Sequence, residues 1–165
     1  MEIYRDFKEL LELFNAGRVE YLVVGGYALA HHGAPRYTRD LDLYVRPTRA
    51  NARRVMAALD AFGFGQTGLK AEDIEQPGQV VQLGFPPVRI DLVTSIDGVS
   101  WEQAAEGSSQ GEYGGTPAPF LGRTELIANK KAVARSQDLA DVERLEGPAE
   151  EEGPAEEDGW GEEGA

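Results

Sequence analysis

Hydrophobic residues in the first half of the chain recur either three to four positions apart or in short unbroken runs. The first pattern predicts a helix that ends at Gly17, and its buried stripe consists of Ile3, Phe7, Leu10, Leu11 and Phe14. The unbroken runs Tyr21–Val24 and Leu41–Val45 predict two buried strands. A short helix is predicted between them over residues 27–32, because Pro35 cannot continue a helix. The chain therefore opens as helix, strand, short helix and strand.

The middle of the chain continues this mixture. Thr48 is the predicted N-cap of a helix that ends at Gly63, and the apolar stripe of this helix is Val55, Met56, Leu59 and Phe62. Two further strands are predicted over residues 79–85 and 88–94, with a turn at Pro86-Pro87 between them. Such a pair, joined by a tight turn, is expected to form a hairpin.

The end of the folded body is predicted to be helical. Ser100 begins a short helix, and the glycine-rich residues 111–115 indicate a loop. Thr124 and Ser136 are the predicted N-caps of two closing helices over residues 125–135 and 137–145. Together the elements predict an α/β (α+β) fold, in which a small mixed sheet is flanked by helices.

Composition changes at residue 147 and predicts a boundary between a folded domain, residues 1–146, and an acidic tail, residues 147–165. The tail holds eight acidic residues and no basic one, and Gly-Pro-Ala-Glu-Glu occurs in it twice. A segment with so few apolar residues cannot offset the entropy lost on ordering, so the tail is predicted to be disordered. A solubilising role and a role in docking a partner both fit this composition.

Charge and composition exclude several classes of protein. The formal net charge is −13, but the chain without its tail has 16 basic and 21 acidic residues, a net charge near −5 that neither supports nor excludes a nucleic-acid substrate. The absence of cysteine excludes disulfide scaffolds, thiolate catalysis and zinc ribbons. No apolar run approaches the roughly 20 residues of a membrane span, and the N-terminus lacks a signal-peptide pattern. A cytoplasmic protein without a membrane partner is therefore expected.

Two aspartates, Asp40 and Asp42, open the second predicted strand, and two glycines, Gly25 and Gly26, follow the first predicted strand. Asp40 and Asp42 are two positions apart, so in a strand their carboxylates point to the same face. Two like charges this close repel unless a cation lies between them, and Mg²⁺ prefers such oxygen ligands. The Gly25-Gly26 turn leads into a helix whose first N–H groups can bind an anion. These features predict a site for a metal-bound nucleoside triphosphate.

A third carboxylate lies in the strand predicted near residue 90. Residues 88–93 are apolar apart from Arg89 and Asp91, and a carboxylate in a buried strand needs a partner or a metal. If this strand lies beside residues 41–45, Asp91 can join Asp40 and Asp42 in a cluster that holds two metals about 3.5–4 Å apart. Taken singly, an Asp-x-Asp pair is most often solvated and a strand aspartate most often ion-paired. Their occurrence together, in this order, favours a functional site.

This ordered set of motifs resembles the nucleotidyltransferase superfamily related to DNA polymerase beta, and its small bacterial members and abortive-infection-type members above all. The shared pattern is Gly-Gly, then Arg-x-Thr-x-Asp-Leu-Asp, then a strand aspartate: Gly25, Gly26, Arg36, Thr38, Asp40, Asp42 and Asp91. The resemblance continues into the closing helices at residues 126–130, with Arg135, Asp138 and Asp141. It implies a minimal nucleotidyltransferase fold, dependence on Mg²⁺ (or Mn²⁺), and transfer of a nucleoside monophosphate from an NTP with release of pyrophosphate.

The resemblance also implies a role for each matching residue. The implied metal ligands and catalytic residues are Asp40, Asp42 and Asp91, of which the last would help to deprotonate the acceptor hydroxyl. The implied nucleotide-binding residues are Gly25, Gly26, Arg36, Thr38 and Lys130. Many relatives have Gly-Ser in place of Gly-Gly, so Gly26 would offer only its N–H to the terminal phosphates.

Two functions of different classes remain open at this point. The first is an active Mg²⁺-dependent nucleotidyltransferase with a tRNA end, a protein hydroxyl or a small molecule such as an antibiotic as acceptor. Resemblance to abortive-infection-type proteins adds a toxin role, with a cognate antitoxin as partner. The second is a catalytically silent nucleotide-binding or antitoxin-like module with the same fold. The intact carboxylate set favours the enzyme, because buried carboxylates with no metal to bind would destabilise the fold.

Overall fold

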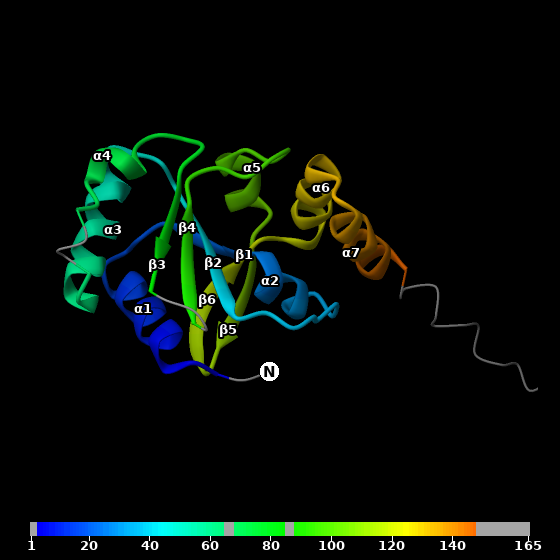
Figure 1. The fold of residues 1–165 in the computed structure, drawn as a ribbon, viewed down its shortest axis with the longest axis horizontal. Helices are drawn as coiled ribbons and strands as arrows, with labels where there is room; N and C mark the ends of the chain where they lie inside the picture. Colours follow the sequence, from blue (N-terminus) through cyan, green and yellow to red (C-terminus); the bar gives the residue numbers. More distant parts are fainter. Residues whose placement is uncertain (1–2, 65–67, 85–87, 148–165) are drawn as a thin grey trace, which may run out of the picture.

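One mixed sheet of six strands, with helices on both of its faces, forms the centre of the protein and confirms the predicted α/β class (Figure 1). The computed structural model describes residues 3–64, 68–84 and 88–147. Its helices are α1 (Arg5–Ala16), α2 (Gly25–His31), α3 (Arg49–Phe62), α4 (Ala71–Ile74), α5 (Trp101–Glu106), α6 (Arg123–Val133) and α7 (Ser136–Glu146). Its strands are β1 (Tyr21–Val24), β2 (Asp40–Val45), β3 (Val80–Leu83), β4 (Arg89–Val93), β5 (Ser109–Tyr113) and β6 (Thr116–Phe120).

The order of the strands across the sheet is β3-β4-β2-β1-β6-β5. Strand β2 runs antiparallel to β1 and parallel to β4, and β1 runs parallel to β6. Each edge of the sheet is an antiparallel pair of consecutive strands, β3 with β4 and β5 with β6. The strand that carries Asp91 therefore lies beside the strand that carries Asp40 and Asp42, as predicted.

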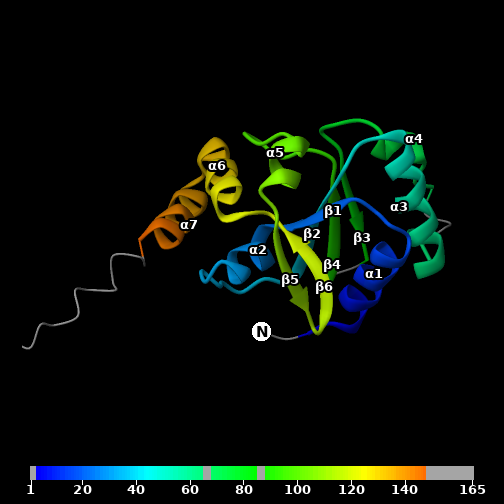
Figure 2. The ribbon, with the colours of Figure 1, turned by 180° about the vertical axis from the view of Figure 1, so that it is seen from behind.

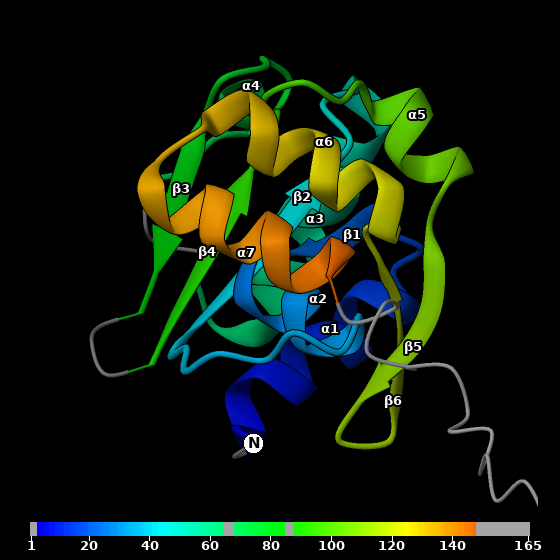
Figure 3. The same cartoon turned by 90° about the vertical axis from the view of Figure 1, so that its right-hand side faces the viewer.

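The sheet separates two layers of helices. Helices α1, α3 and α4 cover one face, and α2, α6 and α7 cover the other (Figures 1 and 2). Seen from the side of α6 and α7, these two helices lie in front of α2, with β3 and β5 toward opposite edges (Figure 3). None of the helices in the described ranges is both long and apolar enough to cross a membrane. The largest fully buried side chains are Phe7, Phe14, Leu10, Leu11, Leu29, Leu41, Leu43, Leu59, Ile74, Leu92, Leu121 and Leu126.

Local capping accounts for the ends of two helices as predicted. The Thr48 hydroxyl accepts the backbone N–H of Asn51 at 3.2 Å at the start of α3, and Gly63 ends this helix in the left-handed conformation (φ 107°). At α5, the Ser100 hydroxyl accepts the N–H of Gln103 (3.2 Å), and the Gln103 side chain accepts the N–H of Ser100 (2.9 Å). This is a reciprocal capping box, which satisfies two backbone donors.

The glycine-rich segment predicted as a loop forms the hairpin of β5 and β6 instead. Gly114 and Gly115 both have positive φ (55° and 86°), which matches a two-residue type I′ turn. Pro117 and Pro119 make the sequence of β6 unlike that of a strand, because proline has no backbone N–H to donate to a neighbouring strand. In this register the pair flanking the turn is hydrogen-bonded, so both prolines fall in the alternate, non-hydrogen-bonded pairs with β5. They remove no bond of the hairpin.

The starts of the two closing helices also differ from the prediction. Thr124 and Ser136 are not N-caps: α6 follows Gly122, and α7 follows Arg135. The reason at α7 is Asp138, whose carboxylate accepts the backbone N–H of Arg135 at 3.2 Å. Helix α4 is a further element that the pattern does not predict. Phe85, the Pro86-Pro87 turn and the predicted tail from residue 148 onward lie outside the described residues.

Candidate active site

The register of β2 against β4 brings the three predicted carboxylates to one end of the sheet. Asp42 lies opposite Asp91, and Asp40 lies opposite Arg89. Asp42 also lies opposite Val24, the last residue of β1, so Gly25 follows directly beside it. The site is therefore built where β1 ends and where β2 and β4 begin.

Arg89, which the sequence does not single out as a site residue, lies among these carboxylates. One of its terminal nitrogens (Nη2) is 3.1 Å from Oδ2 of Asp40 and 3.1 Å from Oδ2 of Asp91. Its Nε is 3.0 Å from Oδ1 of Asp91, but the N–H is not aligned for a hydrogen bond. A single guanidinium thus bridges the carboxylates of two neighbouring strands.

Gly25 and Gly26 let the turn into α2 approach the start of β2 closely. Gly25 has a φ of +68°, and a Cβ there would lie 2.2 Å from Oδ2 of Asp42. A Cβ at Gly26 would lie 2.9 Å from the Cβ of Thr38. Thr38 in turn donates to the carbonyl of Asp40 (3.2 Å) and accepts its N–H (3.3 Å). Both glycines are thus needed for the carboxylates and the turn to lie in contact.

Replacing Gly25 with alanine should destabilise the protein more than replacing Gly33, which also has positive φ (+85°) but has no atom within 4 Å of an added Cβ. In both variants the alanine Cβ is strained at positive φ, which lowers the free energy of unfolding by about 1–2 kcal/mol. Gly25→Ala must also displace the Asp42 carboxylate, which should lower the free energy of unfolding by a further 1–3 kcal/mol or so. Urea unfolding of both variants measures the difference. Equal losses would show that the turn and Asp42 can move apart freely.

Asp42 is the carboxylate whose protonation the site changes most. Burial, together with the nearby charges of Asp91 and Asp40 and a hydrogen bond with Asp91, raises the pKa of Asp42 to about 7. The Arg89 guanidinium opposes this rise. A proton held between two carboxylates in this way is replaced readily by a divalent cation.

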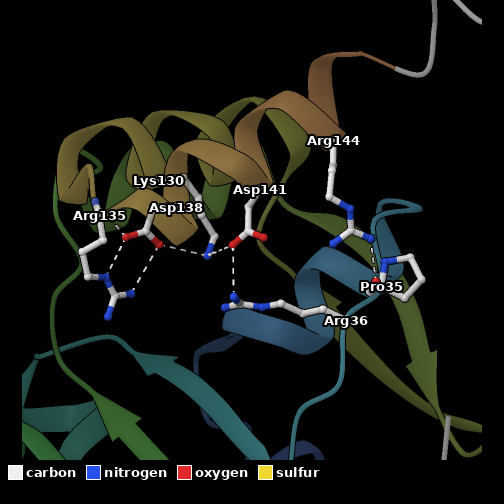
Figure 4. A network of polar contacts seen from close by, with 7 residues as sticks. All are labelled: Pro35, Arg36, Lys130, Arg135, Asp138, Asp141 and Arg144. Carbon is white, nitrogen blue, oxygen red and sulfur yellow. Dashed lines mark hydrogen bonds and ion pairs between the residues drawn. The ribbon is translucent and has the colours of Figure 1, made fainter.

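A second charged cluster joins α6, α7 and the segment after α2 (Figure 4). The ammonium of Lys130 is buried and lies 3.3 Å from Oδ1 of Asp138 and 3.0 Å from Oδ2 of Asp141. Arg36 reaches the same Oδ2 of Asp141 at 3.5 Å from the segment after α2. Arg135 binds Asp138 through Nε (2.7 Å), and this hydrogen bond, followed by that of Lys130, lowers the pKa of Asp138.

This cluster also ties the C-terminal helices to the rest of the protein. Arg144 donates to the carbonyl of Pro35 at 2.6 Å, and Arg36 is the next residue along the chain. Arg123, at the start of α6, donates to the carbonyl of Leu145 near the end of α7. The segment that leads into Asp40 is therefore held against α7 from one side.

The structure divides the predicted site residues into two groups. Gly25, Gly26, Thr38 and the three carboxylates Asp40, Asp42 and Asp91 lie together. The two predicted phosphate contacts, Arg36 and Lys130, meet on Asp141 instead. Because the charge of Lys130 is already compensated by two carboxylates, a phosphate contact through it stays a prediction. The sequence does carry a signal for Arg89, since Arg-x-Asp in a strand puts both side chains on one face.

The residues at the end of the sheet offer the donor set that a magnesium ion needs. Oδ1 of Asp91 is buried and accepts no hydrogen bond, although Nε of Arg89 lies 3.0 Å away, and Oδ2 of Asp42 lies where a side chain on Gly25 would be. Oxygen-only ligands of this kind suit Mg²⁺ and Mn²⁺. Among the described residues, however, no three acidic or histidine side chains converge on one point as metal ligands. Carboxylate oxygens suit a divalent cation, and Arg89 contacts two of the three carboxylates, those of Asp40 and Asp91.

Comparison with known proteins identifies the fold. No family model matches the sequence, and no curated protein matches it significantly. The chain is similar in structure to the lincosamide antibiotic adenylyltransferase LnuA with lincomycin bound, with a TM-score of 0.52, 12% identity, and coverage of 89% of this chain and 99% of that one. It is also similar to a putative nucleotidyltransferase from Thermotoga maritima, with a TM-score of 0.55, 13% identity, and coverage of 89% and 92%. The predicted nucleotidyltransferase fold is confirmed; the abortive-infection subtype stays a prediction.

Proposed function

We propose that this protein is a metal-dependent nucleotidyltransferase, which moves a nucleoside monophosphate from an NTP to a hydroxyl acceptor. The observation that carries the proposal is the meeting of Asp40, Asp42 and Asp91 on two adjacent parallel strands, directly beside the Gly25–Gly26 turn. Carboxylates next to backbone without side chains would supply metal ligands and backbone contacts for phosphates at one place. The nucleotidyltransferase fold supports this proposal.

In the proposed reaction, the acceptor oxygen forms a bond to the α-phosphorus of the NTP. The bond from this phosphorus to the oxygen that bridges to the β-phosphate breaks, and pyrophosphate leaves. Asp91 is buried, and its Oδ1, which accepts no hydrogen bond but lies 3.0 Å from Nε of Arg89, would accept the proton of the acceptor hydroxyl. Gly25 and Gly26 would offer their backbone N–H groups to the phosphates, and Thr38, against Gly26, is hydrogen-bonded to the backbone of Asp40 at the start of β2.

The proposed cofactor is Mg²⁺, with Mn²⁺ as a substitute. Asp40 and Asp42 would bind it from β2 and Asp91 from β4. When bound, the metal supplies charge neutralisation at the triphosphate and polarisation of the attacking hydroxyl. Arg36 would have to leave Asp141 to contact phosphate, and about a quarter of its side chain is exposed (26%).

The acceptor classes that we propose to test are an RNA end, a protein hydroxyl and a small molecule. LnuA, whose fold is similar, is a lincosamide adenylyltransferase, so lincomycin and ATP belong in the panel. A toxin role with a cognate antitoxin would follow if the acceptor is an essential RNA or protein. In that case, expression should arrest bacterial growth, and Asp42→Asn should abolish the arrest.

One observation favours a second candidate, a catalytically silent nucleotide-binding module. Arg89 pairs with Asp40 and Asp91 and neutralises part of the charge that a metal would otherwise have to balance. An intact carboxylate set is therefore compatible with a protein that has lost turnover. Such a module would bind metal–NTP and keep its affinity for a partner without transferring anything.

The experiment that separates the two is label transfer from each of four α-³²P-labelled NTPs. The purified protein is offered total tRNA, a cell protein extract, lincomycin and itself, with Mg²⁺ or Mn²⁺. An Asp40→Ala/Asp42→Ala variant is run alongside. Label in one acceptor pool, absent with the variant, supports the transferase. Nucleotide binding by calorimetry without any transfer supports the silent module, and no binding at all contradicts the site.

Metal affinity should rise with pH up to about 7 and then level off. The Asp42 carboxyl, with its pKa raised to about 7, must release its proton before a cation can bind. Below that pH, affinity should increase about tenfold per pH unit, since one proton leaves per metal bound. Calorimetric titration with Mn²⁺ between about pH 5.5 and about pH 8.5 measures how the affinity changes with pH. A pH-independent affinity would contradict the role of Asp42 as a ligand.

The same pKa predicts how the metal-free protein responds to pH. The pKa of Asp42 in the folded protein, about 7, lies above the value of 3.8 for an unperturbed carboxyl. Between these two values the folded form holds the proton and the unfolded form does not, so the folded state binds more protons. The contribution of Asp42 to stability is therefore fully present below pH 4 or so and is lost as the pH rises to about 7.

A further inference from the structure

The starts of β2 and β4 bring three carboxylates together on two neighbouring strands. Asp91 is buried, with 11% of its side chain exposed, and Asp40 and Asp42 lie on the adjacent strand. On the other side of β4, the residue opposite Asp91 is the neutral Gln82. Three carboxylates therefore face one another, and the only cation that contacts them within the described residues is Arg89.

The contacts of Arg89 are those that a bound cation would make. Its guanidinium reaches Asp40 at 3.1 Å and both oxygens of Asp91 at 3.0 and 3.1 Å. These are two of the three proposed metal ligands, and they belong to two different strands. Because a guanidinium keeps its charge at any ordinary pH, it cannot make room by losing a proton. A metal ion that uses the same oxygens has to displace it.

We propose that Arg89 is a built-in counter-cation, which occupies the metal position in the metal-free protein and leaves when a divalent cation binds. This inference rests on the proposed metal-dependent function of the same site. It assigns Arg89 as a positioning residue, which keeps the carboxylates together without metal and lowers their affinity for it.

The partial exposure of its side chain would allow Arg89 to move away from the carboxylates into solvent. The Arg89 side chain is 31% exposed, against 11% for the side chain of Asp91, so Arg89 reaches solvent although its Nε is buried against the carboxylate. Once displaced, the guanidinium stays within reach of the triphosphate that the same carboxylates and metal would hold. Arginine binds phosphate oxygens strongly. Metal binding should therefore be weak without nucleotide and tighter with it.

The test measures binding of Mn²⁺ alone, by calorimetry at low ionic strength, to the full chain and to Arg89→Gln. The variant should bind Mn²⁺ about tenfold more tightly, because the removed charge repels the cation and competes with it for the same oxygens. Arg89→Lys, which keeps the charge but loses the fork of donors, should fall between the two. Arg46→Gln is the matched control, because Arg46 forms an ion pair with Glu20 (3.0 Å) that does not involve the site. The affinity of this variant for Mn²⁺ should be unchanged.

Thermal unfolding with and without Mn²⁺ gives a second readout that does not depend on activity. Arg89→Gln should unfold at a lower temperature than wild type without metal, and Mn²⁺ should raise that temperature more in the variant. A variant that folds only with Mn²⁺ would also support the proposal. Equal or weaker Mn²⁺ binding by Arg89→Gln would overturn it and would show that Arg89 orients the ligands of a bound metal.

The proposed function and this inference fail differently in these experiments. If neither wild type nor Arg89→Gln binds Mn²⁺, even with an NTP present, the metal site itself is wrong and both proposals fall. If both bind Mn²⁺ with equal affinity and label transfer occurs, the function stands and only the role of Arg89 is overturned.

Discussion

Replacing Asp42 with asparagine should lower nucleotide transfer by about a thousandfold or more and leave the protein folded. Asp42 is central to the site, because it lies opposite Asp91 in the sheet and against Gly25. Losing its charge removes a shared metal ligand and the charge balance that metal-assisted displacement requires. The measurement is label transfer at saturating NTP and metal, for whichever acceptor wild type uses.

The fold should tolerate this change, since the amide resembles the protonated carboxyl. With a pKa of about 7, Asp42 is already partly neutral near neutral pH in the metal-free protein. Above that pH, the variant should be slightly more stable than wild type, because the repulsion from Asp91 and Asp40 is gone. Asp60→Asn, an exposed aspartate on α3, is the matched control and should keep full activity. Activity retained in Asp42→Asn would contradict the proposed site.

Replacing Lys130 with methionine should lower the free energy of unfolding by about 3 kcal/mol. Methionine keeps most of the volume of the side chain but leaves Asp138 and Asp141 without their shared cation. Both carboxylates are buried, with 2% and 4% of their side chains exposed. Arg135 and Arg36 would compensate them only in part, each from one side.

The adjacent Lys131 provides the control within the same helix. Its ion pair with Glu146 is as short, at 3.0 Å, but both side chains are about half exposed (56% and 49%). Lys131→Met should therefore change stability by less than about 1 kcal/mol. Urea unfolding of the two variants measures the difference. If Lys130→Met keeps its stability but loses transfer, Lys130 is available to the substrate, and the phosphate contact predicted from the sequence gains support.

Local chemistry made the elements around the site predictable. The run Tyr21–Val24 is a strand with the predicted bounds, and the caps of α3 follow from Thr48 and Gly63 alone. The alternation of β2 places Asp40 and Asp42 on one face whatever the rest of the fold does. These features depend on the backbone preferences of neighbouring residues, which the sequence states directly.

The hairpin of β5 and β6 shows where such reasoning fails. Prolines and glycines at residues 111–119 have the composition of a loop, and only the register with β5 shows that the prolines remove no hydrogen bond. Lys130 is similar. Two adjacent lysines on one helix look alike in sequence, yet α7 buries the first against Asp138 and Asp141 and leaves the second exposed.

The sequence by itself determined the chemical groups of this protein: an Asp-x-Asp strand, a later strand aspartate and a glycine turn, in an order that indicates nucleotide transfer. The tertiary structure alone decided how they meet. Placing β2 beside β4 in one register sets Asp42 against Asp91 and turns Arg89 toward Asp40. Electrostatic interactions depend on distance and burial, and both come from pairing between segments about 50 residues apart along the chain. No local pattern specifies that pairing.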